Sequence, residues 1–328
     1  MTITIHEKNN CRFPLTRRGS PAKLVFMILK LKFNFIFNIK LIWRGVFMFK
    51  LLRKALLLAC CAVAAHAQED YFITYTHQME EPGNLEVAIR TVNGFPRDGH
   101  AFTGSAVEFE YGVKAWWTSE LYLDGQTTSG ESTLFTGFRF ENRFRPLLRE
   151  HWINPVLYFE FENINSADKS LLEVVGHDVR DDFLGRNDRS EKKREAELKL
   201  ILSSNFKGWN VAENLIAEKN LAGDPWEFGY SAGVSRPLAL AASANACRLC
   251  RENFSAGAEL YGGLGTRYRF GLQETSHYLS PTINFRMPNG PTFKAAPGFG
   301  LTSGSHGFLL RFGVSYEIEQ IFSKLRSR

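Results

Sequence analysis

The stretch STLFTGFRFENRF, residues 132–144, decides the fold class of this chain. Its charged side chains, Arg139, Glu141 and Arg143, occupy odd positions. Its even positions are mostly apolar and include Leu134, Thr136, Phe138, Phe140 and Phe144. Successive side chains of a β-strand point to opposite faces, so this spacing predicts a strand with one aromatic face and one charged face.

The same alternation recurs along the rest of the chain. It is strong in 105–117, 156–163, 195–203 and 308–318, and weaker in 71–78, 84–93, 118–127, 209–219, 226–237, 254–263, 277–286 and 293–301. Turn-forming residues such as Thr128-Ser129-Gly130 and Pro288-Asn289-Gly290 separate many of these segments, while long helical periodicity is absent. The pattern is typical of an antiparallel meander.

If these segments close into a barrel, the number of strands that they can form is constrained. Together these segments make thirteen candidate strands, whereas single-chain bacterial barrels usually have an even number. We therefore predict about 12 strands, with about 10 or 14 as alternatives. Either 71–78 or 293–301, which contains Pro297, is surplus, unless Leu171–His177 adds a further strand.

A soluble sandwich and a membrane barrel both show alternation, and three features favour the barrel. The apolar faces are long and aromatic, tryptophans stand near the segment ends, and the opposite faces carry full charges. The packed middle of a sandwich rarely accepts such charges. The predicted fold is all-β, an antiparallel up-and-down transmembrane β-barrel, with a soluble sandwich or lipocalin-like barrel as the alternative.

Lipid excludes charge, so the charged faces are predicted to line the lumen. An excess of lumen carboxylates would favour cations, whereas dense Arg–Glu pairing would fill a narrow barrel and block conduction. The predicted lumen-facing residues are Glu108, Glu110, Lys114, Arg139, Glu141, Arg143, Glu160, Glu162, Glu195, Glu197, Lys199, Arg311 and Glu317.

The stretch Met48 to Ala67 has the three parts of a secretory signal peptide. A basic start is followed by an apolar run and by the small-x-small site Ala65-His66-Ala67. We predict that Met48 is the true start, that residues 1–47 are a mis-annotated or disordered extension, and that the barrel occupies 68–328. The net charge of +6 then belongs to the leader, because residues 68–328 carry a net charge of −5.

Two motifs resemble those of known barrels. Arg311-x-Gly313-x-x-Tyr316-x-Ile318 resembles the C-terminal insertion signal of bacterial outer-membrane barrels, although Ile318 replaces the final aromatic residue and ten residues follow it. The run Val107–Val113 with Leu121-Tyr122-Leu123 resembles outer-membrane barrel proteins grouped with transporters or with aromatic-degradation operons. The resemblance implies a location in the outer membrane of a Gram-negative bacterium and no residue-level chemistry.

Cys247 and Cys250 are the only cysteines of residues 68–328. Their spacing and the oxidising cell envelope predict a disulfide that tightens a loop. The alternatives are a redox pair or half of a zinc site, but no second ligand pair stands nearby. The acidic connection 165–192 lacks the spacing of an EF-hand.

No catalytic constellation stands out. The chain has no GxSxG or HExxH motif, and Ser276 and His277 would point to opposite faces of a strand. We predict no enzyme activity, no cofactor and no metal. The predicted function is a passive channel or transport component for small solutes. The alternatives are an outer-membrane enzyme acting on lipid or peptide and a non-conducting structural or ligand-holding barrel. The expected partners are outer-membrane lipids, the barrel-insertion machinery and small solutes, and no nucleic acid.

Overall fold

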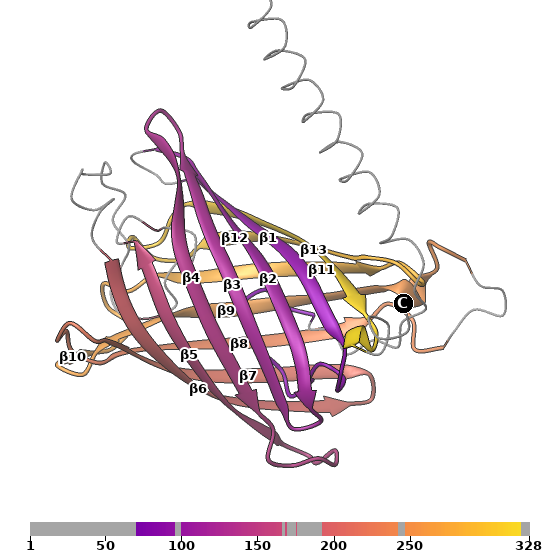
Figure 1. Cartoon of the computed structure of the whole chain (residues 1–328). Coiled ribbons are helices and arrows are strands. Elements are labelled where there is room, and N and C mark those ends of the chain that lie inside the picture. The colour runs from indigo at the N-terminus through magenta and orange to yellow at the C-terminus, as the bar shows by residue number, and fades with distance from the viewer. Residues whose placement is uncertain are drawn as a thin grey trace, which may run out of the picture. The chain divides into compact units, whose positions relative to one another are not determined.

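The computed structural model describes residues 70–95, 100–165, 168, 175, 192–241 and 247–322. Its long strands follow one another around a single sheet (Figure 1). They are β1 Leu85–Phe95, β2 Phe102–Lys114, β3 Trp117–Thr128, β4 Ser132–Phe144, β5 Asn154–Asn165, β6 Lys192–Phe206, β7 Trp209–Asn220, β8 Glu227–Pro237, β9 Phe254–Thr266, β11 His277–Arg286, β12 Thr292–Gly300 and β13 Phe308–Ile318.

The sheet closes on itself because the first strand pairs with the last. Leu85 of β1 lies opposite Ile318 of β13, and every neighbouring pair of strands is antiparallel. The short β10, Arg269–Phe270, only extends a hairpin from β9, and β8 pairs directly with β9. The barrel therefore has twelve long strands, which confirms the predicted fold class and strand number.

We call the end where β1 begins and β13 ends the terminal end, and the other the opposite end. The connections β2–β3 and β6–β7 at the terminal end are tight, whereas the connection 166–191 joins β5 to β6 at the opposite end. Among the described residues, no helix is long and apolar enough to span a membrane.

Alternating exposure along each strand separates an inner from an outer face. In β5, Glu160 is 5% exposed, whereas its neighbours Phe159 and Phe161 are 47% and 37% exposed. At the terminal end, Trp116 and Trp117 stack with Phe144, as in the aromatic girdle of a membrane interface. The outer face is thus apolar at mid-strand and aromatic at its rim.

One predicted strand boundary is wrong, and so is the predicted face of part of one strand. The segments 105–117 and 118–127 divide at a turn, Ala115–Trp116, because β2 ends at Lys114. In β4 the partner register shifts, so that Thr136 is buried and Phe135 is 67% exposed. A β-bulge adds one residue and reverses the alternation beyond it, which the sequence pattern alone did not reveal.

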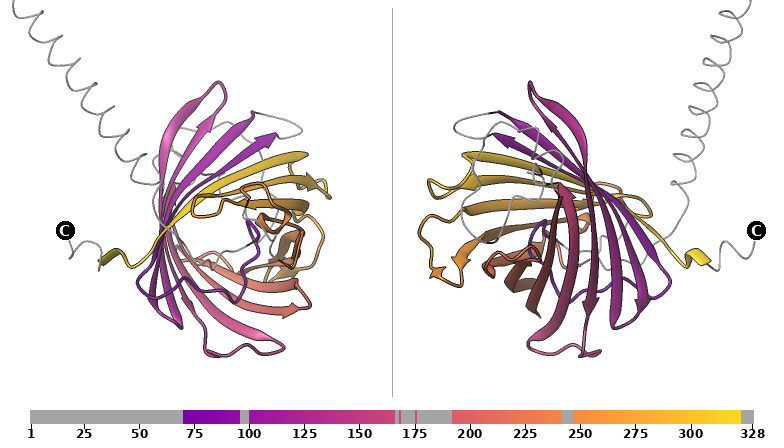
Figure 2. Two further views of the ribbon diagram at one scale, coloured as in Figure 1. Left: turned by 90° about the vertical axis from the view of Figure 1, so that its right-hand side faces the viewer. Right: turned by 60° about the vertical axis from the view of Figure 1, so that its left-hand side comes forward.

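The surplus candidate strand is 71–78, whereas 293–301 corresponds to β12. Residues 71–78 belong to a coil that precedes β1 and lies inside the barrel, where Figure 2 (left) shows the indigo chain crossing the ring of strands. We call residues 70–84 the lumen segment. Of the alternative strand Leu171–His177, only Val175 is described, and it forms an isolated bridge with Gly229.

The predicted extension 1–47 and signal peptide 48–67 lie outside the described residues and remain predictions.

Candidate functional site

Nine neighbouring strands each place one glutamate at the same level of the sheet. Glu317 of β13 lies opposite Glu86 of β1, which lies opposite Glu110 of β2, and the pairing continues strand by strand. The set, which we call the glutamate row, consists of Glu317, Glu86, Glu110, Glu120, Glu141, Glu160, Glu197, Glu218 and Glu227.

The glutamate row connects the two ends of the barrel. Strands of a closed barrel tilt, so a row perpendicular to them climbs along the barrel axis. Glu86 and Glu317 lie near the terminal end, whereas Glu227 is the first residue of β8 at the opposite end. The first seven members are buried and the last two are half-buried. The row therefore forms a continuous acidic track up the inner face.

Like charges directly opposite one another destabilise a sheet, so the row needs compensation. Arg143 provides most of it near the terminal end: its Nη2 lies 2.5 Å from Glu110 Oε1 and also contacts Glu120, and its Nε lies 3.2 Å from Glu141 Oε1. Arg143 is 1% exposed. One guanidinium thus bridges three successive members of the row.

Two further cations serve the middle of the row. Arg139 lies 3.3 Å from Glu160 and 3.1 Å from Asp124, and Lys199 Nζ lies 2.6 Å from Glu197 Oε1. Beside the row, Arg90 pairs with the fully buried Glu108. Charge-assisted contacts of this kind are the strong ones in a protein interior, so the row is held in a fixed arrangement.

Buried tyrosines supply additional donors. Tyr122 Oη donates to Glu120 Oε2 at 2.6 Å, Tyr75 Oη donates to Glu141 Oε2 at 2.9 Å, and Tyr158 Oη donates to Glu160. The same rings face the cations, because Arg139 lies 4.1 Å from the Tyr122 centroid and Lys199 lies 4.1 Å from that of Tyr158. The tyrosines therefore stabilise both charge signs at once.

The lumen segment is held by side chains rather than by strand pairing. Both carboxylate oxygens of Glu259 accept backbone N–H bonds, from Phe72 at 2.9 Å and from Ile73 and Thr74 at 2.8 Å. Asn214 accepts from Tyr75 N at 2.7 Å and donates to Tyr75 O at 2.9 Å. These contacts replace the ladder that a β-strand would have, which explains how an extended coil can remain buried.

A cavity of about 160 Å³ remains between the lumen segment and the wall. Among the residues that the structure describes, carboxylates outnumber cations around it. Its charged lining comprises Asp124, Glu160, Glu162, Asp168, Glu195, Glu197 and Glu218, and the cations Arg90, Arg139, Lys199 and Arg311. The cavity has room for a few waters or a small ion.

Most of the residues predicted to line the lumen lie on the inner face. The buried ones are Glu108, Glu110, Arg139, Glu141, Arg143, Glu160, Glu162, Glu195, Glu197, Arg311 and Glu317. The side chain of Lys199 is 11% exposed. Lys114 is the exception, because the register shifts after Gly112 and the strand ends there, which leaves Lys114 exposed.

Four members of the row were not among the residues predicted to face the lumen: Glu86, Glu120, Glu218 and Glu227. Each stands in a segment with weak alternation, so no single segment marked it as inward. Part of the lumen segment, residues 71–78, was predicted to be a strand and is a coil. Its polar residues, such as Thr74 and Thr76, could have indicated that it is not a membrane-spanning strand, since such a strand needs one continuous apolar face toward lipid.

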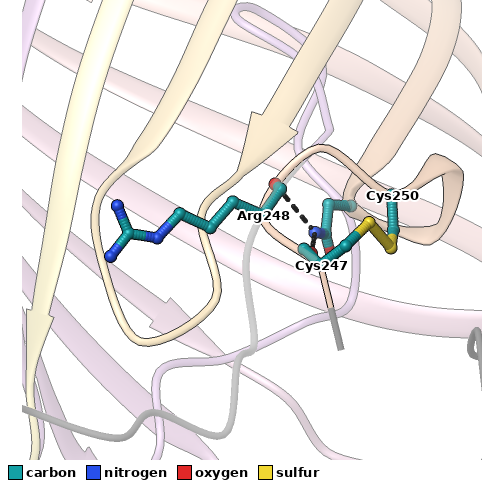
Figure 3. The surroundings of a disulfide bond; sticks show 4 residues. Cys247, Arg248 and Cys250 are labelled. Carbon is teal, nitrogen blue, oxygen red and sulfur yellow. Dashed lines mark hydrogen bonds between the residues drawn. A yellow bond between two sulfur atoms is a disulfide. The ribbon is translucent and has the colours of Figure 1, made fainter. Parts of the chain in front are cut away.

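A disulfide joins Cys247 to Cys250 in the connection between β8 and β9 at the terminal end (Figure 3). Asn253 Nδ2 donates to the carbonyl oxygens of Cys247 and Arg248, both at 3.1 Å. The pair tightens a loop outside the sheet.

No protein-family model matches the chain, and no curated protein matches it. An outer-membrane channel from Pseudomonas putida F1 aligns with a TM-score of 0.50 and 11% identity, covering 74% of this chain and 98% of that one. LpxR from Salmonella typhimurium aligns with a TM-score of 0.37 and 9% identity over 70% of this chain and 99% of its own. The translocator domain of the autotransporter NalP from Neisseria meningitidis gives 0.38 and 11%, over 71% and 87%. The first similarity shows the fold of an outer-membrane barrel.

Proposed function

We propose that this chain is a bacterial outer-membrane channel for small solutes, with a preference for cations. The glutamate row carries the proposal, because it lines the inner face from one end of the barrel to the other. Rings and tracks of carboxylates are a common basis of cation selectivity in pores. The similarity in fold to the Pseudomonas putida channel supports the same reading.

The lumen segment sets the expected conductance. It crosses the interior and narrows it, and the cavity beside it has a volume of about 160 Å³. With the segment docked, water and small ions pass while larger solutes do not. The terminal end is expected to face the periplasm, since the longest connection, 166–191, joins strands at the opposite end and barrels of this class carry their longest loops outside the cell.

Planar-bilayer conductance of the purified protein tests the proposal. The wild type is expected to conduct weakly, with cations favoured over anions. A variant lacking residues 70–79 is expected to conduct several-fold more, because every strand pairing of the barrel lies outside this deletion. A deletion variant that assembles into a barrel but does not conduct would contradict the proposed channel function.

A charge reversal tests the selectivity. Glu218 belongs to the row and lines the cavity, so Glu218→Lys is expected to lower the ratio of cation to anion permeability. Glu213 stands on the same strand but is exposed on the outer face, so Glu213→Lys is the matched control and is expected to leave the ratio unchanged. Equal ratios in the wild type and in Glu218→Lys would contradict a role of the row in permeation.

A non-conducting barrel is the second candidate. The observation in its favour is the filled interior, with the lumen segment bound through Glu259 and Asn214 and with Arg143 bridging the wall glutamates. If neither the wild type nor the deletion variant conducts in planar bilayers, this candidate is favoured.

A further inference from the structure

Three buried carboxylates, two of them members of the glutamate row, converge near the terminal end. Glu86, Glu108 and Glu110 each offer an oxygen, and these oxygens lie within 4.8 Å of one another. Oxygens that bind one Ca²⁺ at about 2.3–2.6 Å can be at most about 5 Å apart. The three residues are 6%, 0% and 9% exposed and stand on paired strands, so their geometry is set by strand pairing and not by mobile loops.

A fourth buried carboxylate, from a different part of the chain, interacts electrostatically with this group. Glu80 belongs to the lumen segment, is 3% exposed, and has an Oε1 atom without a hydrogen-bond partner among the described residues. The charges that act on it most strongly are those of Glu317 and Glu86. A buried carboxylate oxygen left in this position has lost its hydration and needs either a proton or a cation.

Within the described part of the chain, the carboxylates around this group outnumber the cations beside them. Arg90 pairs with Glu108, Arg143 pairs with Glu110, and Lys294 acts on Glu86. Arg143 also serves Glu120 and Glu141, so its charge is divided among three carboxylates. Each ionised carboxylate can accept more than two contacts, and an ion pair on one lone pair does not prevent metal binding on another.

We propose that Glu86, Glu108 and Glu110, with Glu80, form a buried binding site for a hard divalent cation, for which Ca²⁺ is the probe. Carboxylate oxygens without nitrogen or sulfur ligands favour Ca²⁺ or Mg²⁺ over transition metals. The bound ion joins β1 and β2 to the lumen segment through Glu80. The site does not depend on conduction and would exist equally in a non-conducting barrel.

Calorimetric titration of CaCl₂ into the full-length protein in detergent, after treatment with a chelator, tests the site. One Ca²⁺ is expected to bind with a Kd of about 1 mM or tighter. Glu80→Gln is expected to weaken binding about tenfold or more, because a charged ligand is lost while every strand stays unchanged. The double variant Glu86→Gln, Glu110→Gln is expected to abolish binding.

Glu195→Gln is the matched control, since Glu195 is an equally buried wall carboxylate whose Oε1 accepts from Asn220 at 3.2 Å. It is expected to bind Ca²⁺ as the wild type does. No saturable binding to the wild type, or equal binding by the wild type and Glu80→Gln, would overturn the proposal. These measurements need no conductance, so failure of the channel function and failure of the cation site are separate outcomes.

Discussion

Glu259 illustrates how one side chain can hold a whole segment. It is 1% exposed, and its carboxylate accepts three consecutive backbone N–H groups of the lumen segment. Leaving a buried N–H without an acceptor costs about 1–3 kcal/mol. Without this carboxylate, the segment is expected to be more stable in water, where its N–H groups are hydrated, than docked in the lumen.

Glu259→Ala is therefore expected to undock the lumen segment while the barrel stays assembled. Ile73→Cys, introduced in a background without Cys247 and Cys250, reports the change through its labelling rate with a water-soluble maleimide. Labelling is expected to be several-fold faster with Glu259→Ala, and Glu259→Gln, which keeps one acceptor oxygen, is expected to lie between. Unchanged labelling would show that Glu259 does not hold the segment.

A substitution at Phe140 tests whether this side chain faces lipid in the middle of the membrane. It is 46% exposed and lies between the inward Arg139 and Glu141. A lysine at mid-depth on the lipid face costs about 2–4 kcal/mol, and near an interface about 0–1 kcal/mol. Phe140→Lys is expected to reduce folding into bilayers, measured as the heat-modifiable gel shift. Thr133→Lys, on the outer face near the end of the same strand, is the control, and an equal loss in both would contradict the assigned depth.

At the scale of the element, the loop with the disulfide is separate from the strands that close the barrel. Cys247 and Cys250 lie in the connection between β8 and β9, and the register of these strands runs from Glu227 to Pro237 without either cysteine. Replacing both by serine is expected to leave insertion and the gel shift unchanged. Thiol alkylation of the wild type is expected only after reduction, and labelling without reductant would contradict the disulfide.

The lumen segment has a titratable contact at its terminal-end side. His77 is buried, with Nε2 at 2.9 Å from Glu150 Oε2, close to Arg145, and its backbone N–H donates to Ser203 Oγ at 2.8 Å. Burial lowers the pKa of His77, and the Glu150 carboxylate opposes this shift only in part.

Docking of the segment is therefore expected to weaken as the pH falls. A released His77 has an ordinary pKa near about 6.5 and takes up a proton first, so protons favour the undocked form between that pH and the lower pKa of the docked form. The Ile73→Cys labelling rate, divided at each pH by the rate of a free thiol to correct for the changing thiolate fraction, is expected to rise as the pH falls through this interval. His77→Gln removes the titrating group, and a wild-type pH dependence that persists in this variant would assign the effect to another group.

For the whole molecule, closure depends on one pairing between residues more than two hundred positions apart. β1 pairs with β13 along its full length, from Leu85 with Ile318 to Phe95 with Phe308. Ending the chain after Gly307 would leave β1 and β12 with open edges, which lipid cannot hydrate. This truncation is expected to abolish the heat-modifiable form. Ending the chain after Phe322 keeps every described pairing and is expected to preserve it.

The period-2 pattern of the sequence by itself determined the class of fold, most strand positions and which residues share a face. These properties depend on neighbours in sequence. Arg139, Glu141 and Arg143 alternate with aromatic residues, and the pleat of a strand places alternate side chains on opposite faces of the sheet. The pattern could not find the bulge at Thr136, since one inserted residue reverses the faces without changing composition.

Only the tertiary structure decided the register and the contents of the lumen. Glu86 meets Glu110 and Glu317 because three strands pair at one particular offset, and a shift of two residues would break the glutamate row while keeping every face. The lumen segment is placed by Glu259 and Asn214, which are distant in sequence and carry no local signal for this role. Local periodicity determines on which face of a strand each side chain lies. The register of the strands and the segment that fills the lumen depend on the free energy of the closed barrel as a whole.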